Sequence, residues 1–455
     1  MDRLLADPLL QAARRLYGTA AVATQARVTL AELRAELSAE HPDPEGPQVA
    51  PETVAARTAR IAALPGAIAR TLEQAFGSPA RRVLNATGIF LHTNLGRAPL
   101  PREVAERLPA LSTAACDLEL DLGSGRRGDR GARLARRLGA LTGAPAAIVV
   151  NNNAAALVLA VAATAAGGEV LVSRGELVEI GGSFRIPEIL EASGARLREV
   201  GTTNRTRLDD YAAAASATTR AILKVHPSNY RLTGFTESVE ARRLVDLAHE
   251  WKIPLIVDEG AGLLRRPLSR RAPASFVSDH ESVAELLAAG VDLVTSSADK
   301  LLGGPQAGLL FGRSELVARC TAHPLYRAFR TGRLVALALD EVLRRHLAGE
   351  TLPIDGLWPA PQSHAARVAA LASRLQAEIG SAEAFAGGGA APGEGIPGPV
   401  LLLPGSDALA ATLRQAETPV VGYLREGRLV LDLRTVAPED DEMLATMVER
   451  ARRAR

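Results

Sequence analysis

Residues 293–308 read LVTSSADKLLGGPQAG and decide the fold class of the chain. A short aliphatic run, typical of a strand, leads into a polar segment, then Lys300, then a Gly-Gly-Pro turn. A lysine just past a strand end can reach into a cleft, where desolvation or nearby cations lower its pKa and leave an amine able to form a Schiff base. The alternative is an exposed lysine in a turn.

Lysine usage points to the same residue. The chain has 53 basic residues, of which only Lys224, Lys252 and Lys300 are lysines. Base composition of the gene accounts for an arginine excess, so the excess alone proves nothing. Because lysine can lose its proton and act as a nucleophile whereas arginine stays charged, each lysine is a candidate for chemistry.

A carboxylate follows an earlier strand. Residues 256–262 read IVDEGAG and place Asp258 at the C-terminal end of a buried strand, where ligands bind in open α/β sheets. A carboxylate there can keep a pyridine nitrogen protonated, so that the ring accepts electrons from a carbanion. The alternative is that Asp258 only caps the next turn.

A third polar segment lies between a strand and an alanine-rich helix, where residues 147–156 read AIVVNNNAAA. The first amides of a helix have no intrahelical partner and carry partial positive charge. With Asn152, Asn153 and the Ala154 amide as donors, this turn is a candidate seat for a phosphate, and Ser297 can add a hydroxyl. The alternative is that the asparagines only cap the helix.

The order of these segments fits pyridoxal 5'-phosphate held on a doubly wound sheet. The phosphate seat comes first, then Asp258 at a strand end, then Lys300 after a later strand. His226 follows another strand and is expected either to approach the cofactor ring or to be a buried structural histidine. No Cys/His cluster supports a metal site.

Strand-like and helix-like segments alternate over residues 79–333, which predicts a catalytic domain with a mostly parallel sheet covered on both faces. Residues 1–78 predict a helical domain with a Pro-rich interruption at 41–51. Residues 334–455 predict a small α/β domain, with a flexible loop at 386–399. Predicted strands are Ala147–Val150, Glu169–Val172, Arg196–Val200, Ala221–Val225, Pro254–Val257, Leu293–Thr295 and Gly308–Phe311. Predicted helices include Leu4–Tyr17, Ala154–Ala166, Val239–Trp251, Leu334–His346 and His364–Ile379, and a hairpin is expected around Glu426-Gly427.

Composition excludes several classes of protein. With 47% hydrophobic and 23% charged residues among 455, the chain can bury a core and is neither disordered nor collagen-like. Nearly apolar runs such as residues 154–166 fall short of the ~20 residues of a membrane span, and the N-terminus lacks a signal-peptide pattern. A net charge of +2 gives no general attraction to polyanions. Cys116 and Cys320 are too few for a disulfide framework, and we expect buried thiols in a reducing cytoplasm.

Several longer blocks resemble the bacterial L-seryl-tRNA(Sec) selenium transferase family. The resemblance extends from about Arg81 to the end of the chain. The matching blocks are residues 83–100 (VLNATGIFLHTNLGRAPL), 173–187 (SRGELVEIGGSFRIP), 201–206 (GTTNRT), 224–230 (KVHPSNY), 299–308 (DKLLGGPQAG) and 430–435 (VLDLRT).

The resemblance implies an α/β fold of the aspartate-aminotransferase type (fold type I), with pyridoxal 5'-phosphate on Lys300. It implies conversion of L-seryl-tRNA(Sec) to selenocysteinyl-tRNA(Sec) with selenophosphate, through an aminoacrylyl group on the cofactor. Lys300 would remove the α-proton while Asp258 keeps the ring nitrogen protonated. The implied assembly is a homo-oligomer built from dimers, a decamer in this family, with active sites at dimer interfaces.

The same resemblance implies further site residues. Arg327 and Arg330 match an Arg-x-x-Arg segment that helps bind the selenium donor, and planar guanidinium groups suit such an oxyanion. Otherwise they are ordinary surface arginines. Thr202 and Thr203 are placed near the same anion, and Arg97 is a further substrate-binding candidate.

Residues 1–78 take the place of the family's tRNA-binding helical domain, with Arg14, Arg15, Arg57 and Arg60 as candidate phosphate contacts. Ordinary solvated side chains are the alternative reading of these four arginines. Only a salt-dependent affinity would support binding to RNA.

The chain departs from the family beside the expected cofactor. The family commonly has Asp-Leu-Gly-Ser-Gly where residues 258–262 read DEGAG, and a glycine where Ala298 stands. Glu259 therefore adds a negative charge near a phosphate-bearing cofactor, which affects substrate details rather than the cofactor itself.

Two other functions stay open. A pyridoxal phosphate lyase acting on a free small amino acid or amino sugar acid would share the cofactor core, but such relatives tend to lack the N-terminal helical domain. A catalytically idle RNA-binding or scaffold paralogue is disfavoured by intact Lys300 and Asp258.

Overall fold

The computed structural model describes residues 2–40, 51–77, 80–180, 184–268, 271–273, 276, 280–391, 393, 395–404 and 407–453. Its contacts divide the chain into two compact units, Met1–Arg82 and Val83–Arg455. Residues 41–50 of the predicted Pro-rich interruption (41–51) lie outside the described residues. The predicted boundary between residues 333 and 334 stays a prediction, because the contacts divide the chain only once.

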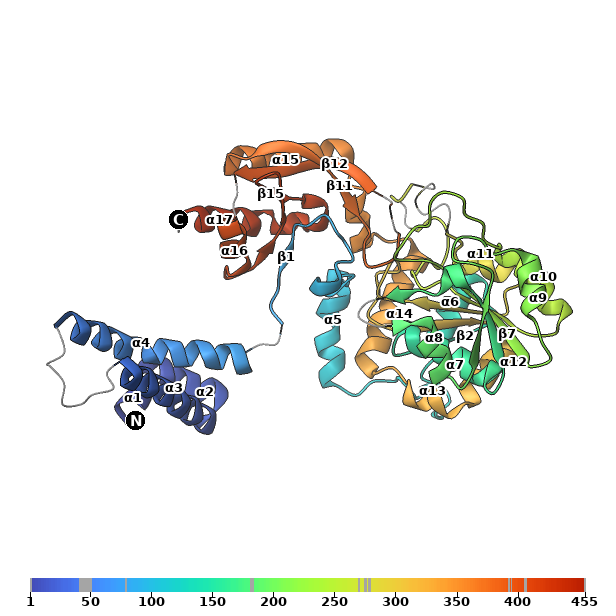
Figure 1. The fold of residues 1–455 in the computed structure, drawn as a ribbon, viewed down its shortest axis with the longest axis horizontal. Coiled ribbons are helices and arrows are strands. Elements are labelled where there is room, and N and C mark those ends of the chain that lie inside the picture. The colour runs from blue at the N-terminus through green and yellow to red at the C-terminus, as the bar shows by residue number, and fades with distance from the viewer. Residues whose placement is uncertain are drawn as a thin grey trace. The chain divides into compact units, whose positions relative to one another are not determined.

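The N-terminal unit consists of helices around a small apolar core (Figure 1). Asp7 caps α2 by accepting a hydrogen bond from the Leu9 amide at 2.9 Å, and Pro8 occupies the first helical position. The helix predicted over Leu4–Tyr17 is therefore two helices. The described helices are α1 (Asp2–Leu5), α2 (Pro8–Tyr17), α3 (Thr19–Glu40) and α4 (Pro51–Phe76). Their buried apolar residues are Leu10, Ala13, Val22, Ala26, Leu64, Ile68 and Leu72.

Seven strands form one large sheet in the second unit, and each strand predicted for it is confirmed (Figure 1). The order across the sheet is β2-β10-β9-β8-β7-β3-β6. β10 runs antiparallel to β2 and β9 while the other four pairs are parallel, so the sheet is mostly parallel and the predicted α/β class is confirmed. The strands are β2 (Ala146–Val150), β3 (Glu169–Ser173), β6 (Arg196–Val200), β7 (Thr219–Val225), β8 (Leu255–Asp258), β9 (Leu293–Ser297) and β10 (Gly308–Gly312).

Helices cover both faces of this sheet, because successive strand residues point to opposite sides. In β2, Val149 packs into one apolar core and Val150 into the other. The first face carries α6 (Ala132–Thr142), α9 (Leu208–Ala214), α10 (Ala241–Glu250), α11 (Val283–Ala288) and α14 (Arg333–Ala348). The second carries α7 (Asn153–Ala165), α8 (Ile186–Ala192) and α12 (Ser314–Ala322). Further elements are α5 (Arg102–Thr113), β4 (Glu179–Ile180), β5 (Phe184–Arg185) and α13 (Pro324–Ala328).

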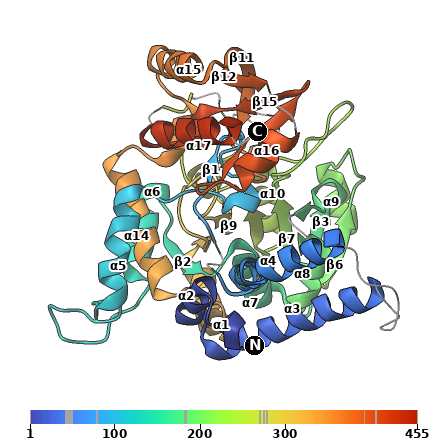
Figure 2. The same ribbon diagram turned by 90° about the vertical axis from the view of Figure 1, so that its left-hand side faces the viewer.

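The C-terminal part contains a four-stranded antiparallel sheet, β11-β12-β15-β14, with helices beside it (Figure 2). The predicted hairpin around Glu426-Gly427 is confirmed by β14 and β15. The elements are α15 (Pro361–Leu375), β11 (Glu378–Phe385), β12 (Gly395–Pro404), α16 (Asp407–Arg414), β13 (Val420–Val421), β14 (Tyr423–Arg425), β15 (Arg428–Leu431) and α17 (Asp441–Arg453).

Two predictions for this part are wrong. Glu378 and Ile379, expected to end a helix, begin β11, because Gln376 adopts a left-handed conformation (φ 47°) that terminates α15. The loop predicted over residues 386–399 ends at Gly395, because Gly395 to Leu402 pair continuously with β11. Non-local strand pairing thus outweighs the glycine and proline content of that segment.

The first strand of the second unit joins this small sheet-and-helix part rather than the large sheet. β1 (Leu84–Asn85) pairs in parallel with β13, and Leu84 and Ala86 pack into the same core as Val368 and Leu431. Among the helices that the structure describes, none is long and apolar enough to cross a membrane.

Candidate active site

Lys300 lies three residues beyond the end of β9, in a buried turn. Lys300 is only 6% exposed, and its Nζ lies 3.4 Å from the Gly389 carbonyl oxygen. Burial lowers the pKa of Lys300, against the opposing effect of Asp258 and Glu259. The alternative of an exposed turn lysine is therefore wrong, and the amine is one that gives up its proton more readily than a surface lysine.

Asp258 is the last residue of β8, beside β9, and is also buried. Its Oδ1 accepts hydrogen bonds from Asn153 Nδ2 and from Thr295 Oγ1, both at 2.8 Å. Burial raises the pKa of Asp258, because these two neutral donors offset only part of the desolvation of its charge. A cation placed against this carboxylate would stabilise its negative charge.

A close approach of two backbone segments brings these residues together. Gly262 has φ +87°, and a Cβ at this position would lie 2.6 Å from the Ser297 carbonyl oxygen. The Leu301 amide also donates to the Ala261 carbonyl at 3.0 Å. Glycine is required here because a side chain would push the turn after Asp258 away from the turn that carries the lysine.

The predicted phosphate seat has a more complex structure than the sequence suggests. Asn152 caps α7, its Oδ1 accepting from the Ala155 amide at 2.8 Å, and Asn153 donates to Asp258. The asparagine side chains are therefore engaged in the structure, and the amides of Asn153 and Ala154 remain as the donors of the first helical turn. Ser297 is buried at the end of β9.

Arg97 reaches the lysine turn from a distant part of the chain. Its Nη1 lies 2.6 Å from Oδ2 of Asp299, the residue before Lys300. Arg97 has φ 63°, and its positive charge adds to the lowering of the Lys300 pKa. The structure thus brings Arg97 to the lysine turn, together with Asp258, Asn153 and Ser297.

His226 lies directly after β7, and its amide donates to the Asp258 carbonyl at 3.0 Å. Burial, followed by the nearby His280, lowers the pKa of His226 to about 3. The ring lines a cavity of about 460 Å³ together with Lys224, Glu259 and His280. His226 is accordingly a half-buried, neutral imidazole next to the strand end of Asp258.

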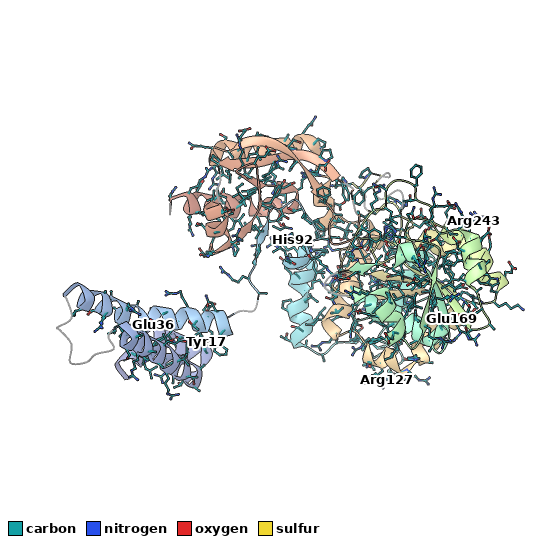
Figure 3. All side chains as sticks on the ribbon, in the orientation of Figure 1. Tyr17, Glu36, His92, Arg127, Glu169 and Arg243 are labelled. Carbon is teal, nitrogen blue, oxygen red and sulfur yellow. The ribbon has the colours of Figure 1, made fainter. Side chains whose placement is uncertain are left out.

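Arg327 and Arg330 line a different hollow, of about 460 Å³, whose wall includes Glu119, Arg127 and Arg130. Arg330 and Arg130 both form ion pairs with the Glu119 carboxylate. Figure 3 shows Arg127 beside α13, the helix that carries Arg327. Within one chain, then, the structure groups the two predicted arginines with other arginines and not with Lys300.

The paired threonines also separate. Thr203 lines the cavity of His226, whereas Thr202 lines an open concavity with Arg174 and Arg205. The Thr202 hydroxyl donates to the Arg205 carbonyl at 2.9 Å. The structure therefore does not place Thr202 and Thr203 with Arg327.

Several residues of this site carry no recognisable signal in the sequence. Thr295 holds Asp258, Gly389 faces the Lys300 amine, and His280 stacks on His226. Glu119 holds two arginines together. Thr295 lies in the strand that leads to the lysine, but nothing in the sequence singles it out, and the other three residues come from distant parts of the chain.

The residues present fit pyridoxal 5'-phosphate. A buried lysine amine of lowered pKa, a buried carboxylate open to a cation, and the free amides of a helix N-terminus match the aldehyde, ring nitrogen and phosphate of that molecule. Each of these groups lies at the C-terminal ends of β2, β8 and β9 or in the turns that follow them.

Comparisons with known proteins agree with this chemistry. The family model described as L-seryl-tRNA selenium transferase matches residues 83–437. The L-seryl-tRNA(Sec) selenium transferase of Carboxydothermus hydrogenoformans is 42% identical over 84% of this chain and 84% of its own. That of Hyphomonas neptunium is 39% identical over 97% of this chain and 95% of its own. Among solved structures, a D-glucosaminate-6-phosphate ammonia-lyase covers 84% of this chain and 99% of its own with a TM-score of 0.59, and at 21% identity this likeness shows the fold alone.

Proposed function

The chain belongs to the L-seryl-tRNA selenium transferase family, and from this membership we infer that it converts L-seryl-tRNA(Sec) to selenocysteinyl-tRNA(Sec). Its fold is that of fold type I pyridoxal phosphate enzymes, and its cofactor is pyridoxal 5'-phosphate. The observation that carries the inference is the buried Lys300 amine beside the buried Asp258 carboxylate, in a chain related to these transferases over nearly its full length.

When bound, the cofactor supplies an electron sink for the carbanion that forms at the α-carbon of the seryl group. Lys300 would hold the cofactor, and its amine, whose pKa is lowered, would be suited to take the α-proton. Asp258 holds a proton on the ring nitrogen, and Thr295 and Asn153 keep the carboxylate in place. The amides of Asn153 and Ala154, with the Ser297 hydroxyl, hold the phosphate.

Selenophosphate is the proposed selenium donor, bound by Arg327 and Arg330 with Thr202 and Thr203 nearby. Its support is the resemblance, together with the cationic hollow that the two arginines line. Because Lys300 of the same chain does not line this hollow, we propose a homo-oligomer built from dimers in which a neighbouring subunit completes each site. Arg97 is proposed to contact the substrate next to Lys300.

The helical unit of residues 1–82 is proposed to bind tRNA(Sec), in the cytoplasm where aminoacyl-tRNA is used. Its support is the helical fold and the match of one relative across 97% of the chain. Arg14, Arg15 and Arg57 are the proposed phosphate contacts, together with Arg60, which already pairs with Glu36.

A turnover assay tests this proposal. Purified protein reconstituted with pyridoxal 5'-phosphate is given seryl-tRNA(Sec) and selenophosphate, and the selenocysteine released from the tRNA by hydrolysis of the ester is measured. Product with tRNA(Sec) and none with seryl-tRNA(Ser) is expected. The alternative lyase on a free amino acid or amino sugar acid is less supported, and it would give no product here while the visible absorbance of the lysine-bound cofactor is normal.

A further inference from the structure

The carboxylate of Glu259 has no part in the chemistry above, yet it is 1% exposed. It accepts hydrogen bonds from two backbone amides of the following turn, both at 3.0 Å, and from the Ser296 hydroxyl. Its Oε1 lies 2.9 Å from Nε2 of His280, a residue 4% exposed. A charge buried this deeply persists only when donors and an opposite charge surround it.

His280 connects this carboxylate to the cofactor site. Its ring stacks on that of His226, with centroids 3.6 Å apart and planes at 25°. Among the described residues neither ring nitrogen of His280 has a well-aligned hydrogen bond, so the Glu259 carboxylate at one edge and the His226 ring on one face determine its position. His226 is itself anchored by its amide to the Asp258 carbonyl.

We propose that Glu259 and His280 are positioning residues that hold the His226 ring in one orientation against the pyridoxal phosphate site. The inference rests on the proposed cofactor at Lys300. The family commonly has leucine where this chain has Glu259, and leucine accepts no hydrogen bond. The contact of Glu259 with His280 is therefore a feature of this chain. A fixed imidazole presents its donor and acceptor in one direction, which a freely rotating ring does not.

Burial and the groups around His226 together keep its ring neutral. Burial and His280 lower its pKa to about 3, Lys224 and Lys300 act in the same direction, and Glu259 acts against them. Removing the His280 ring would admit water to the cavity and weaken the two largest of these effects. The pKa of His226 would then rise toward the ~6.5 of a free histidine, so the ring would gain a proton as the pH falls through that range.

The test uses full-length protein freed of cofactor and titrated with pyridoxal 5'-phosphate, with visible absorbance recorded between pH 5 and 8. For His280→Ala we expect affinity for the cofactor to fall about tenfold, and the bound absorbance to gain a titration step near pH 6 that the wild type lacks. The double variant Glu259→Leu with His280→Phe keeps a stacked ring and removes both buried ionisable groups. It should bind within about twofold of the wild type and show no such step.

A matched control comes from another histidine–carboxylate pair. His249 Nε2 lies 3.3 Å from Asp292, which precedes β9 at the end of the strand remote from the lysine. His249→Ala should leave the cofactor affinity and the pH profile unchanged.

Each outcome decides the proposal. His280→Ala with wild-type affinity and pH profile would overturn the positioning role, and so would a double variant as weak as His280→Ala, because an aromatic ring would then not suffice. A wild-type protein that shows no lysine-bound absorbance would instead contradict the proposed function. Thermal unfolding of the cofactor-free variants identifies a folding defect, and the double variant still tests the stack if His280→Ala fails to fold.

Discussion

Asp258 and Glu259 are adjacent, buried carboxylates at one strand end, and their surroundings act on them in opposite ways. Asp258 receives two neutral donors, and burial raises its pKa. Burial acts on Glu259 in the same direction, but the contact with His280 and the hydrogen bonds from Ser296 and the backbone outweigh it and lower the pKa to about 2. The protein thus stabilises the charge of the Glu259 carboxylate with its own groups, whereas the Asp258 carboxylate can still accept a cation. We assign the Asp258 side of the strand end to the cofactor.

The largest effect on turnover is expected at Lys300. The contrast between Asp258 and Glu259 matters for function only if Lys300 holds the cofactor. Lys300→Ala should abolish the visible absorbance of the lysine-bound cofactor and reduce turnover at least ~10³-fold, because both the attachment and the proton acceptor are lost. Lys252→Arg, at an exposed lysine, is the control and should change neither. Retained absorbance in Lys300→Ala would place the cofactor on another amine.

The second prediction compares the two carboxylates directly in catalysis. Asp258→Asn keeps an oxygen for Asn153 and Thr295 but carries no charge, so turnover should fall about 10²–10³-fold while the cofactor stays bound. Glu259→Gln should reduce turnover less than about tenfold. Steady-state kinetics on both reconstituted variants checks this, and equal losses would mean that the two carboxylates do not differ in role.

The third prediction concerns acid stability. The pKa of folded Glu259 is lowered from its ordinary 4.5 to about 2, so its contribution to stability is present above pH 4.5 and is lost as the pH falls toward 2. The free energy of unfolding of the wild type, measured with urea, should therefore decrease as the pH falls across this window. For Glu259→Gln it should decrease less steeply. Identical pH slopes for the two proteins would show that the Glu259 carboxylate is not stabilised by its partners.

The smallest effect is expected at Arg97. Its charge helps to lower the pKa of Lys300, so Arg97→Gln should raise that pKa and move the pH dependence of cofactor binding upward. Arg102→Gln, which removes an exposed pair with Glu106, is the control. A downward shift in Arg97→Gln would contradict the geometry of the lysine turn.

The sequence predicts what is local and misses what arrives from a distance. The strands and the positions of Asp258 and Lys300 follow from short hydrophobic runs ending in polar residues, and all are confirmed in the structure. His280 and Gly389 reach the site through tertiary contacts that no spacing encodes. Asn152 shows a further limit, since capping a helix and offering a phosphate seat require the same residue type.

Chemical unfolding of the cofactor-free protein at pH 7 tests the contrast between the two carboxylates most directly. A carboxylate whose folded pKa is raised costs stability above its ordinary pKa, so Asp258→Asn should increase the free energy of unfolding. Glu259→Gln should decrease it by about 2–4 kcal/mol. Added pyridoxal 5'-phosphate should then stabilise the wild type more than Asp258→Asn. A decrease in both variants, with equal stabilisation by the cofactor, would contradict an Asp258 carboxylate left open for the cofactor ring.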